Sequence, residues 1–230
     1  MKAVWRSFLQ LLSLVRQDMM LLAACIGPIL AGLLIRIGIP KLEQALTGWL
    51  DSEQILVPYY GLIDLFYSAI AAILLCFAAA MVILEERDDH IEKYLFVTSL
   101  GQKGYIASRI FIPAVAAFIL TLILLPIFHL STMPVAKLLG LSATGTLQGV
   151  IIALSIVTFS SNKLEGMAVT KMATVIMLGA FVPYFVRGKM QYAAAFLPSF
   201  WAGKGCFLIS AVVALLWIGI ILRIFLKKMI

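Results

Sequence analysis

Residues 58–86, PYYGLIDLFYSAIAAILLCFAAAMVILEE, decide the fold class of this chain. Between Pro58 and the acidic pair Glu85-Glu86, the one charged side chain is that of Asp64. A helix of about 20 mostly apolar residues is long enough to cross the hydrocarbon core of a bilayer, and the apolar part of this stretch reaches that length. The stretch therefore predicts a membrane-spanning helix over about 58–84.

The rest of the chain repeats this pattern. Further predicted spans cover about 20–39, 106–129, 138–160, 167–186 and 205–226. Apolar residues make up 63% of the 230 residues, charged residues make up 13%, and the mean hydropathy is +1.08. So little polar surface cannot coat a soluble protein of this size. No linker, repeat or low-complexity run divides the chain, so we expect one all-α integral membrane domain, 1–230, with six transmembrane helices.

Residues 1–18 form a different kind of segment. One side is apolar at helical spacing: Val4, Phe8, Leu11, Val15 and Met19. The other side carries the polar side chains of Lys2, Arg6, Ser13 and Gln17. This pattern predicts an amphipathic N-terminal helix that lies along the membrane surface. Because charges interrupt the apolar stretch and no small-residue cleavage site follows, we expect the segment to be retained rather than removed as a signal peptide.

The distribution of basic residues predicts the orientation. Twelve of the 18 lysine and arginine residues lie on the side of both termini: Lys2, Arg6, Arg16, Arg87, Lys93, Lys103, Arg109, Lys163, Lys171, Arg223, Lys227 and Lys228. The opposite side holds Arg36, Lys41, Lys137, Arg187, Lys189 and Lys204. This bias places both termini in the cytoplasm of a multi-pass protein of the cell membrane. It also explains the net charge of +7 without a nucleic-acid partner.

The most charged segment connects the second and third predicted spans. Its acidic residues are Glu85, Glu86, Asp88, Asp89 and Glu92. Apolar residues stand where water is expected: Ile91, Leu95, Phe96 and Leu100. One interpretation is a short helix that docks in a groove of a cytoplasmic partner. The alternative is an ordinary solvated loop that closes against the bilayer.

Three motifs resemble those of ABC-2 type permeases, in particular permeases of fluoroquinolone exporters. The first runs through LEERD (84–88), YLFVTSL (94–100) and GYIASR (104–109), with Ser99 where that family often has proline. The second is NKLEGMAVTK at 162–171, and the third is LPSFW at 197–201. Their order and spacing, together with the six predicted spans, extend the resemblance over nearly the whole chain.

This resemblance implies a permease subunit that pairs with an identical or paralogous second permease subunit. The pair would sit on cytoplasmic ABC ATPase subunits and export amphipathic small molecules or drugs by alternating access. Contact with the ATPase is then assigned to Glu85, Glu86, Asp88, Asp89, Ile91, Glu92, Leu95, Phe96 and Leu100. A second cytoplasmic contact is assigned to Asn162, Lys163, Glu165 and Lys171. We expect this chain to bind no cofactor, because the partner ATPase would use Mg-ATP.

Catalytic motifs are missing from the sequence. Gly140 and Gly145 have the glycine spacing of a P-loop, but Thr146 stands where the phosphate-binding lysine belongs. We therefore expect no ATP hydrolysis by this chain. The two histidines, His90 and His129, share no helix face with carboxylates, so no metal site is predicted. GxSxG is absent, which argues against an intramembrane hydrolase.

Polar and small residues inside the spans raise further possibilities. Asp64 is either a cavity residue that attracts cationic substrates or a carboxylate that stays wet at the interface. Gly145 and Gly149 form a GxxxG step that suits close helix packing, which we expect within one subunit. Two other functions remain open: an immunity exporter of hydrophobic peptides such as lantibiotics, and a membrane anchor or assembly factor that transports nothing.

Overall fold

A computed structural model describes residues 2–50, 54–91, 94–95 and 101–229. Within these residues the chain forms helices and no strand. Six helical segments are long and apolar enough to cross a membrane: Met19–Trp49, Val57–Asp88, Gly104–Phe128, Val135–Phe159, Lys163–Phe185 and Phe207–Lys228. The predicted all-α membrane fold with six spans is confirmed.

The first two helices, α1 (Lys2–Gln17) and α2 (Met19–Leu50), are separated at Asp18. The Asp18 carboxylate accepts hydrogen bonds from the backbone N–H groups of Met20 (2.8 Å) and Leu21 (3.3 Å). It therefore caps the N-terminus of α2, where the first N–H groups have no partner within the helix.

Helix α2 continues past Pro40, where the sequence predicted its end. A proline removes one backbone hydrogen bond, and the residues after it can still make theirs. With 32 residues, α2 is about 48 Å long if straight, whereas the hydrocarbon core is about 30 Å thick. Beyond Pro40, the Glu43 carboxylate accepts hydrogen bonds from the N–H groups of Ile55 (2.8 Å) and Leu56 (2.7 Å). These bonds tie the extension to the segment that returns to the bundle.

Helices α3 (Tyr60–Asp88) and α7 (Val135–Phe159) form the centre of the bundle and pack closely against each other. A Cβ atom on Gly145 would lie 2.8 Å from the backbone oxygen of Ser68, and one on Gly149 would lie 3.0 Å from that of Ala72. The two glycines therefore let the helix backbones approach each other. The GxxxG step packs within one subunit, as its sequence predicted.

Three spans are built from several helical pieces. The third joins α5 (Gly101–Ile106), the π-helix η2 (Ala107–Phe111) and α6 (Ile112–Phe128). The fifth joins α8 (Lys163–Thr174), the 3-10 helix η3 (Val175–Phe181) and α9 (Val182–Phe185). The short helix η1 (Val57–Tyr59) leads into α3.

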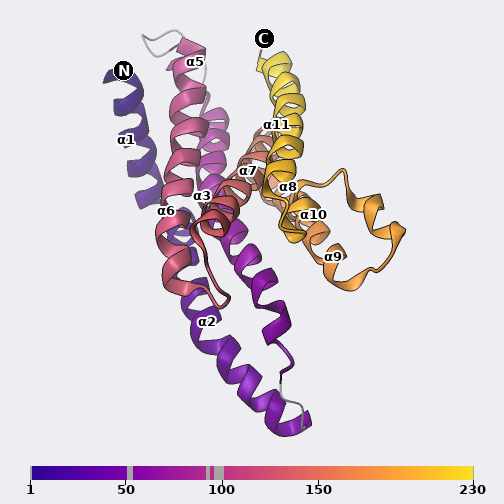
Figure 1. The fold of residues 1–230 in the computed structure, drawn as a ribbon. Helices are drawn as coiled ribbons and strands as arrows, with labels where there is room; N and C mark the ends of the chain where they lie inside the picture. The colour runs from indigo at the N-terminus through magenta and orange to yellow at the C-terminus, as the bar shows by residue number, and fades with distance from the viewer. Residues whose placement is uncertain (1, 51–53, 92–93, 96–100, 230) are drawn as a thin grey trace.

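After the fifth span come η4 (Lys189–Ala194) and α10 (Pro198–Gly203), followed by the sixth span, α11 (Phe207–Met229). Both chain termini lie at one end of the bundle, called the terminal end below (Figure 1). At the opposite end, α2 extends beyond the other helices. The segment between α9 and α10, which contains η4, projects sideways from the bundle. Which end faces the cytoplasm stays a prediction.

Helix α1 buries most of its apolar stripe in the protein. Phe8, Leu11 and Val15 belong to the main hydrophobic core, and α1 contacts α3, α5 and η2. Met19, assigned to the same stripe from the sequence, instead begins α2 and is exposed. The stripe that was expected to face the membrane therefore holds α1 against the bundle, and the placement of α1 along the membrane surface stays a prediction.

Candidate functional site

Two oppositely charged side chains are buried together at the terminal end. Glu86 of α3 is 2% exposed, and Arg109 of the π-helix η2 is 0% exposed. The Arg109 Nε donates to both Glu86 carboxylate oxygens at 3.1 Å, and its Nη2 donates to Oε1. The Tyr105 hydroxyl donates to Oε2 at 2.9 Å. The Glu86 carboxylate is thus neutralised and hydrogen-bonded on both oxygens.

The same arginine reaches α1. Its Nη1 donates to the backbone carbonyl oxygen of Ser7. The Ser7 and Ser108 hydroxyl oxygens lie 3.2 Å apart, and the Ser108 hydroxyl donates to the Tyr105 carbonyl at 3.0 Å. Ser7, Glu86, Tyr105, Ser108 and Arg109, here called the Glu86–Arg109 cluster, connect α1, α3 and the start of the third span.

The π-helix gives Arg109 its position. The Ile112 N–H donates to the Ala107 carbonyl five residues earlier, and Pro113, which follows, has no N–H to donate. This wider turn inserts an extra residue into the helix, a feature often found at functional sites. Ser108 and Arg109, both in this π-helix, are fully buried.

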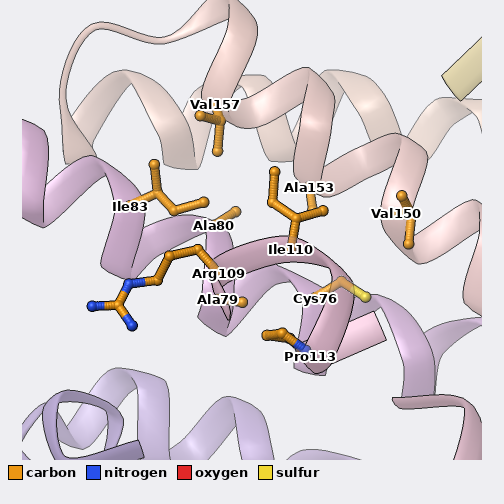
Figure 2. Close-up of a pocket in the computed structure, with 10 residues that line it drawn as sticks. All are labelled: Cys76, Ala79, Ala80, Ile83, Arg109, Ile110, Pro113, Val150, Ala153 and Val157. Carbon is orange, nitrogen blue, oxygen red and sulfur yellow. The ribbon is translucent and has the colours of Figure 1, made fainter. Parts of the chain in front are cut away.

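A small cavity lies beside Arg109. Its lining comes from α3, the third span and α7: Cys76, Ala79, Ala80, Ile83, Arg109, Ile110, Pro113, Val150, Ala153 and Val157 (Figure 2). Figure 2 shows the guanidinium pointing away from the other lining residues. The volume is about 10 Å³, which is close to the space of a single water molecule. This cavity is therefore too small for a transported compound.

A second charged cluster joins three other segments at the terminal end. The Lys163 ammonium of α8 donates to Asp18 at 2.6 Å and to Glu85 at 3.3 Å. The Lys163 backbone N–H donates to the Asp88 carboxylate at 3.2 Å. The hydrogen bond from Lys163 lowers the pKa of the Asp18 carboxyl below its usual value. Asp18, Glu85, Asp88 and Lys163 are called the Lys163 cluster below.

The predicted second cytoplasmic contact begins at this cluster. The Asn162 side chain accepts a hydrogen bond from the Glu165 N–H at 2.9 Å, and the Glu165 carboxylate accepts one from the Ser161 N–H at 2.7 Å. This reciprocal pair caps the N-terminus of α8. Asn162, Lys163 and Glu165 therefore lie together, whereas Lys171 is exposed two turns further along α8.

Two further cations hold the terminal end of α7. Arg87 Nη1 donates to the carbonyl oxygens of Val157 and Ser160, both at 3.0 Å, and Lys228 Nζ donates to that of Thr158 at 2.7 Å. Carbonyl groups at the C-terminal end of a helix lack partners within the helix and attract positive charge. These bonds tie α3 and α11 to α7, a connection that the sequence did not reveal.

The structure separates the residues predicted to contact an ATPase. Asp88, Asp89 and Ile91 are exposed, and Glu85 is partly exposed. Glu86 points into the Glu86–Arg109 cluster, so its carboxylate is unavailable to a partner. Leu95 is partly buried. Three members of the predicted set lie outside the described residues: Glu92, Phe96 and Leu100.

Asp64 lies near the other end of the bundle and holds a turn of the chain. Its carboxylate accepts hydrogen bonds from the N–H groups of Leu130 (2.8 Å) and Ser131 (2.9 Å) and from the Ser131 hydroxyl. Lys137 Nζ donates to that same hydroxyl at 2.7 Å. Asp64 is 1% exposed, so it is not the wet carboxylate of one sequence interpretation. Contact with a substrate stays a prediction.

Comparisons with known proteins identify the family. The family model described as "Fluoroquinolones export permease protein Rv2686c-like" matches residues 12–229. Two curated relatives from strains of Mycobacterium tuberculosis, the fluoroquinolones export permease proteins Rv2686c and MT2760, are each 28% identical over 164 residues, which is 67% of this chain. The match spans 63% of the length of each relative. No solved structure matches. Because the family model covers nearly the whole sequence, this chain belongs to the Rv2686c-like family of fluoroquinolones export permeases.

Proposed function

We propose that this chain is the membrane-spanning permease subunit of an ATP-driven ABC exporter of amphipathic drugs. The family match over residues 12–229 carries the proposal, because the family description names an export permease. The six spans provide the membrane domain that such a subunit requires. Mg-ATP would be hydrolysed by a separate cytoplasmic ATPase, and a second permease subunit, identical or paralogous, would complete an alternating-access pathway.

The end of α3 has a geometry that suits coupling to such an ATPase. Asp88, the last residue of α3, and Asp89, which follows it, are exposed and lead into Ile91 and Tyr94, which expose apolar surface. A partner groove can take such apolar side chains as anchors. In the same helix, Glu86 is bonded to Tyr105 and Arg109 of the third span, and Arg109 in turn is bonded to Ser7 of α1. If a partner moved the segment that follows α3, the movement would therefore be transmitted to several spans at once.

Copurification with the ATPase tests this role. We expect a Leu95→Ala, Phe96→Ala double variant, and an Ile91→Ala, Tyr94→Ala variant, to retain less ATPase and to lose drug-stimulated ATP hydrolysis. A buried apolar anchor contributes about 2 kcal/mol, or roughly 30-fold in affinity, whereas an exposed charge contributes about 1 kcal/mol or less. Asp89→Ala is the matched control and should retain the ATPase. Full retention and full transport in both double variants, at normal expression, would refute the proposed contact.

ATP hydrolysis by the isolated chain provides a second test. Gly140 and Gly145 lie within the continuous helix α7, whereas a P-loop needs a loop that leads into the N-terminus of a helix. We expect the purified chain to show no Mg-ATP turnover above a mock preparation. Turnover without a copurified ATPase would contradict the assignment of hydrolysis to a separate subunit.

A further inference from the structure

A long apolar groove opens on one side of the bundle between the third and sixth spans. Its walls are the helix made of α5, η2 and α6 on one side and α11 on the other, and α7 forms its floor. Residues that line it include Ile110, Ala114, Ala143, Leu215 and Leu222. All three helices are membrane spans, so the groove faces the hydrocarbon layer of the bilayer.

The lining offers no polar group to a ligand. The one hydroxyl-bearing residue in it is Thr146, whose hydroxyl already donates to the Ser142 carbonyl at 2.8 Å. The groove has a volume of about 520 Å³, whereas an engineered apolar cavity of about 150 Å³ takes one benzene molecule. An elongated hydrocarbon chain therefore suits both its size and its chemistry.

Charge at the terminal end of the groove favours one class of lipid. Neither residues 101–128 nor residues 207–229 contain an aspartate or a glutamate. Arg223 is exposed and directly follows the groove residue Leu222. With Arg223 exposed and no acidic residue in these two segments, the mouth attracts a phosphate group.

We propose that this groove binds an acyl chain of an anionic phospholipid, whose headgroup phosphate lies beside Arg223. The site is independent of the proposed coupling to an ATPase, because it uses none of the residues of the connection after α3. It also differs from a drug site, because a drug with charged or polar groups would find no partner for them in the lining.

Native mass spectrometry of the purified full chain tests the proposal. The protein is exchanged into dioleoyl phosphatidylglycerol or dioleoyl phosphatidylcholine, and the bound lipid is weighed after release from detergent. We expect wild-type protein to retain phosphatidylglycerol in preference to phosphatidylcholine. Ala143→Trp should fill the groove and remove the bound lipid, whereas Leu216→Trp, an exposed position on α11 outside the groove, should keep it. Arg223→Gln should lower the preference for phosphatidylglycerol by about fivefold.

Two results would overturn the proposal. The first is equal lipid retention in wild type and Ala143→Trp; if this variant fails to elute as a folded protein, Ala114→Leu, a smaller filling of the same groove, replaces it. The second is a disulfide-linked dimer formed efficiently by a Val115→Cys variant in the membrane. That dimer would show that a second copy of the chain, rather than a lipid, covers this surface.

Discussion

The buried pair of Glu86 and Arg109 gives a sharp prediction about stability. In a Glu86→Gln variant, the shape of the side chain is kept, but Arg109 loses its counter-charge while it remains fully buried. The guanidinium donors that now bind two carboxylate oxygens would face an amide with one oxygen and one NH₂ group. Removal of one partner from a buried ion pair costs about 3–5 kcal/mol.

The neighbouring residue is a matched control. Glu85→Gln removes the same charge one position earlier, where the side chain is 36% exposed and Lys163 keeps its closer bond to Asp18. A partly exposed pair contributes about 1 kcal/mol or less. For a chain of this size, each kcal/mol shifts the melting temperature by about 2–4 °C. Thermal unfolding in detergent should therefore show a loss of roughly 6–20 °C for Glu86→Gln and less than about 4 °C for Glu85→Gln.

A double-mutant cycle isolates the interaction itself. Arg109→Gln should also be destabilising, because Glu86 would keep a single hydroxyl donor, from Tyr105. The double variant Glu86→Gln, Arg109→Gln has no buried charge and should be less destabilised than the sum of the two single variants by about 1–3 kcal/mol. Strict additivity, or a Glu86→Gln effect as small as that of Glu85→Gln, would refute the reasoning.

Three further predictions concern other parts of the molecule. Gly145→Ala should lower the melting temperature, because the new Cβ would lie 2.8 Å from a backbone oxygen of α3. Gly219→Ala, which has open space around it, should not lower it. Equal effects of the two substitutions would contradict the close packing of α3 and α7. The lowered pKa of Asp18 means that its bond to Lys163 stabilises the fold above pH 3.8 and is lost as the pH falls through the lower, folded-state pKa. The difference in melting temperature between wild type and Asp18→Asn should therefore shrink in acid, and a constant difference down to about pH 2 would oppose this. A Met190→Cys variant, 83% exposed beyond the fifth span, should react with a membrane-impermeant maleimide in intact cells, and reaction only after lysis would reverse the predicted topology.

The spans were predictable from the sequence because each depends on a local count of apolar residues. The end of the first span was not predictable, because a proline such as Pro40 after an apolar run does not show whether the helix ends or continues. The bonds from Glu43 to Ile55 and Leu56 join the extension to residues outside the helix. Such contacts depend on the tertiary position of the segment that follows the helix, and no local sequence pattern predicts that position.

The candidate site was predicted in part. The charged connection and the start of α8 were both identified, but their meeting through Asp88 and Lys163 joins residues 75 positions apart. Neighbouring residues on a helix point about 100° apart, so the rotation of α3 decides that Glu86 faces inward and Glu85 does not. The charge distribution assigns Arg109 to the basic residues on the side of both termini, although a charge within a predicted span is itself a signal of a buried partner. The π-helix shifts the helical register at this point, so helical periodicity alone could not predict the direction of the Arg109 side chain.

The extension of α2 would convert a small tilt of this helix into a larger displacement at its far tip. If α2 is straight, a tilt of 10° about its capped end at Asp18 would move the far tip by roughly 8 Å. Trp49, 92% exposed near that tip, is already a fluorophore at the point of largest travel. Small movements of the packed helices at the terminal end could therefore be detected at the opposite face of the membrane, as changes in distance or in Trp49 fluorescence.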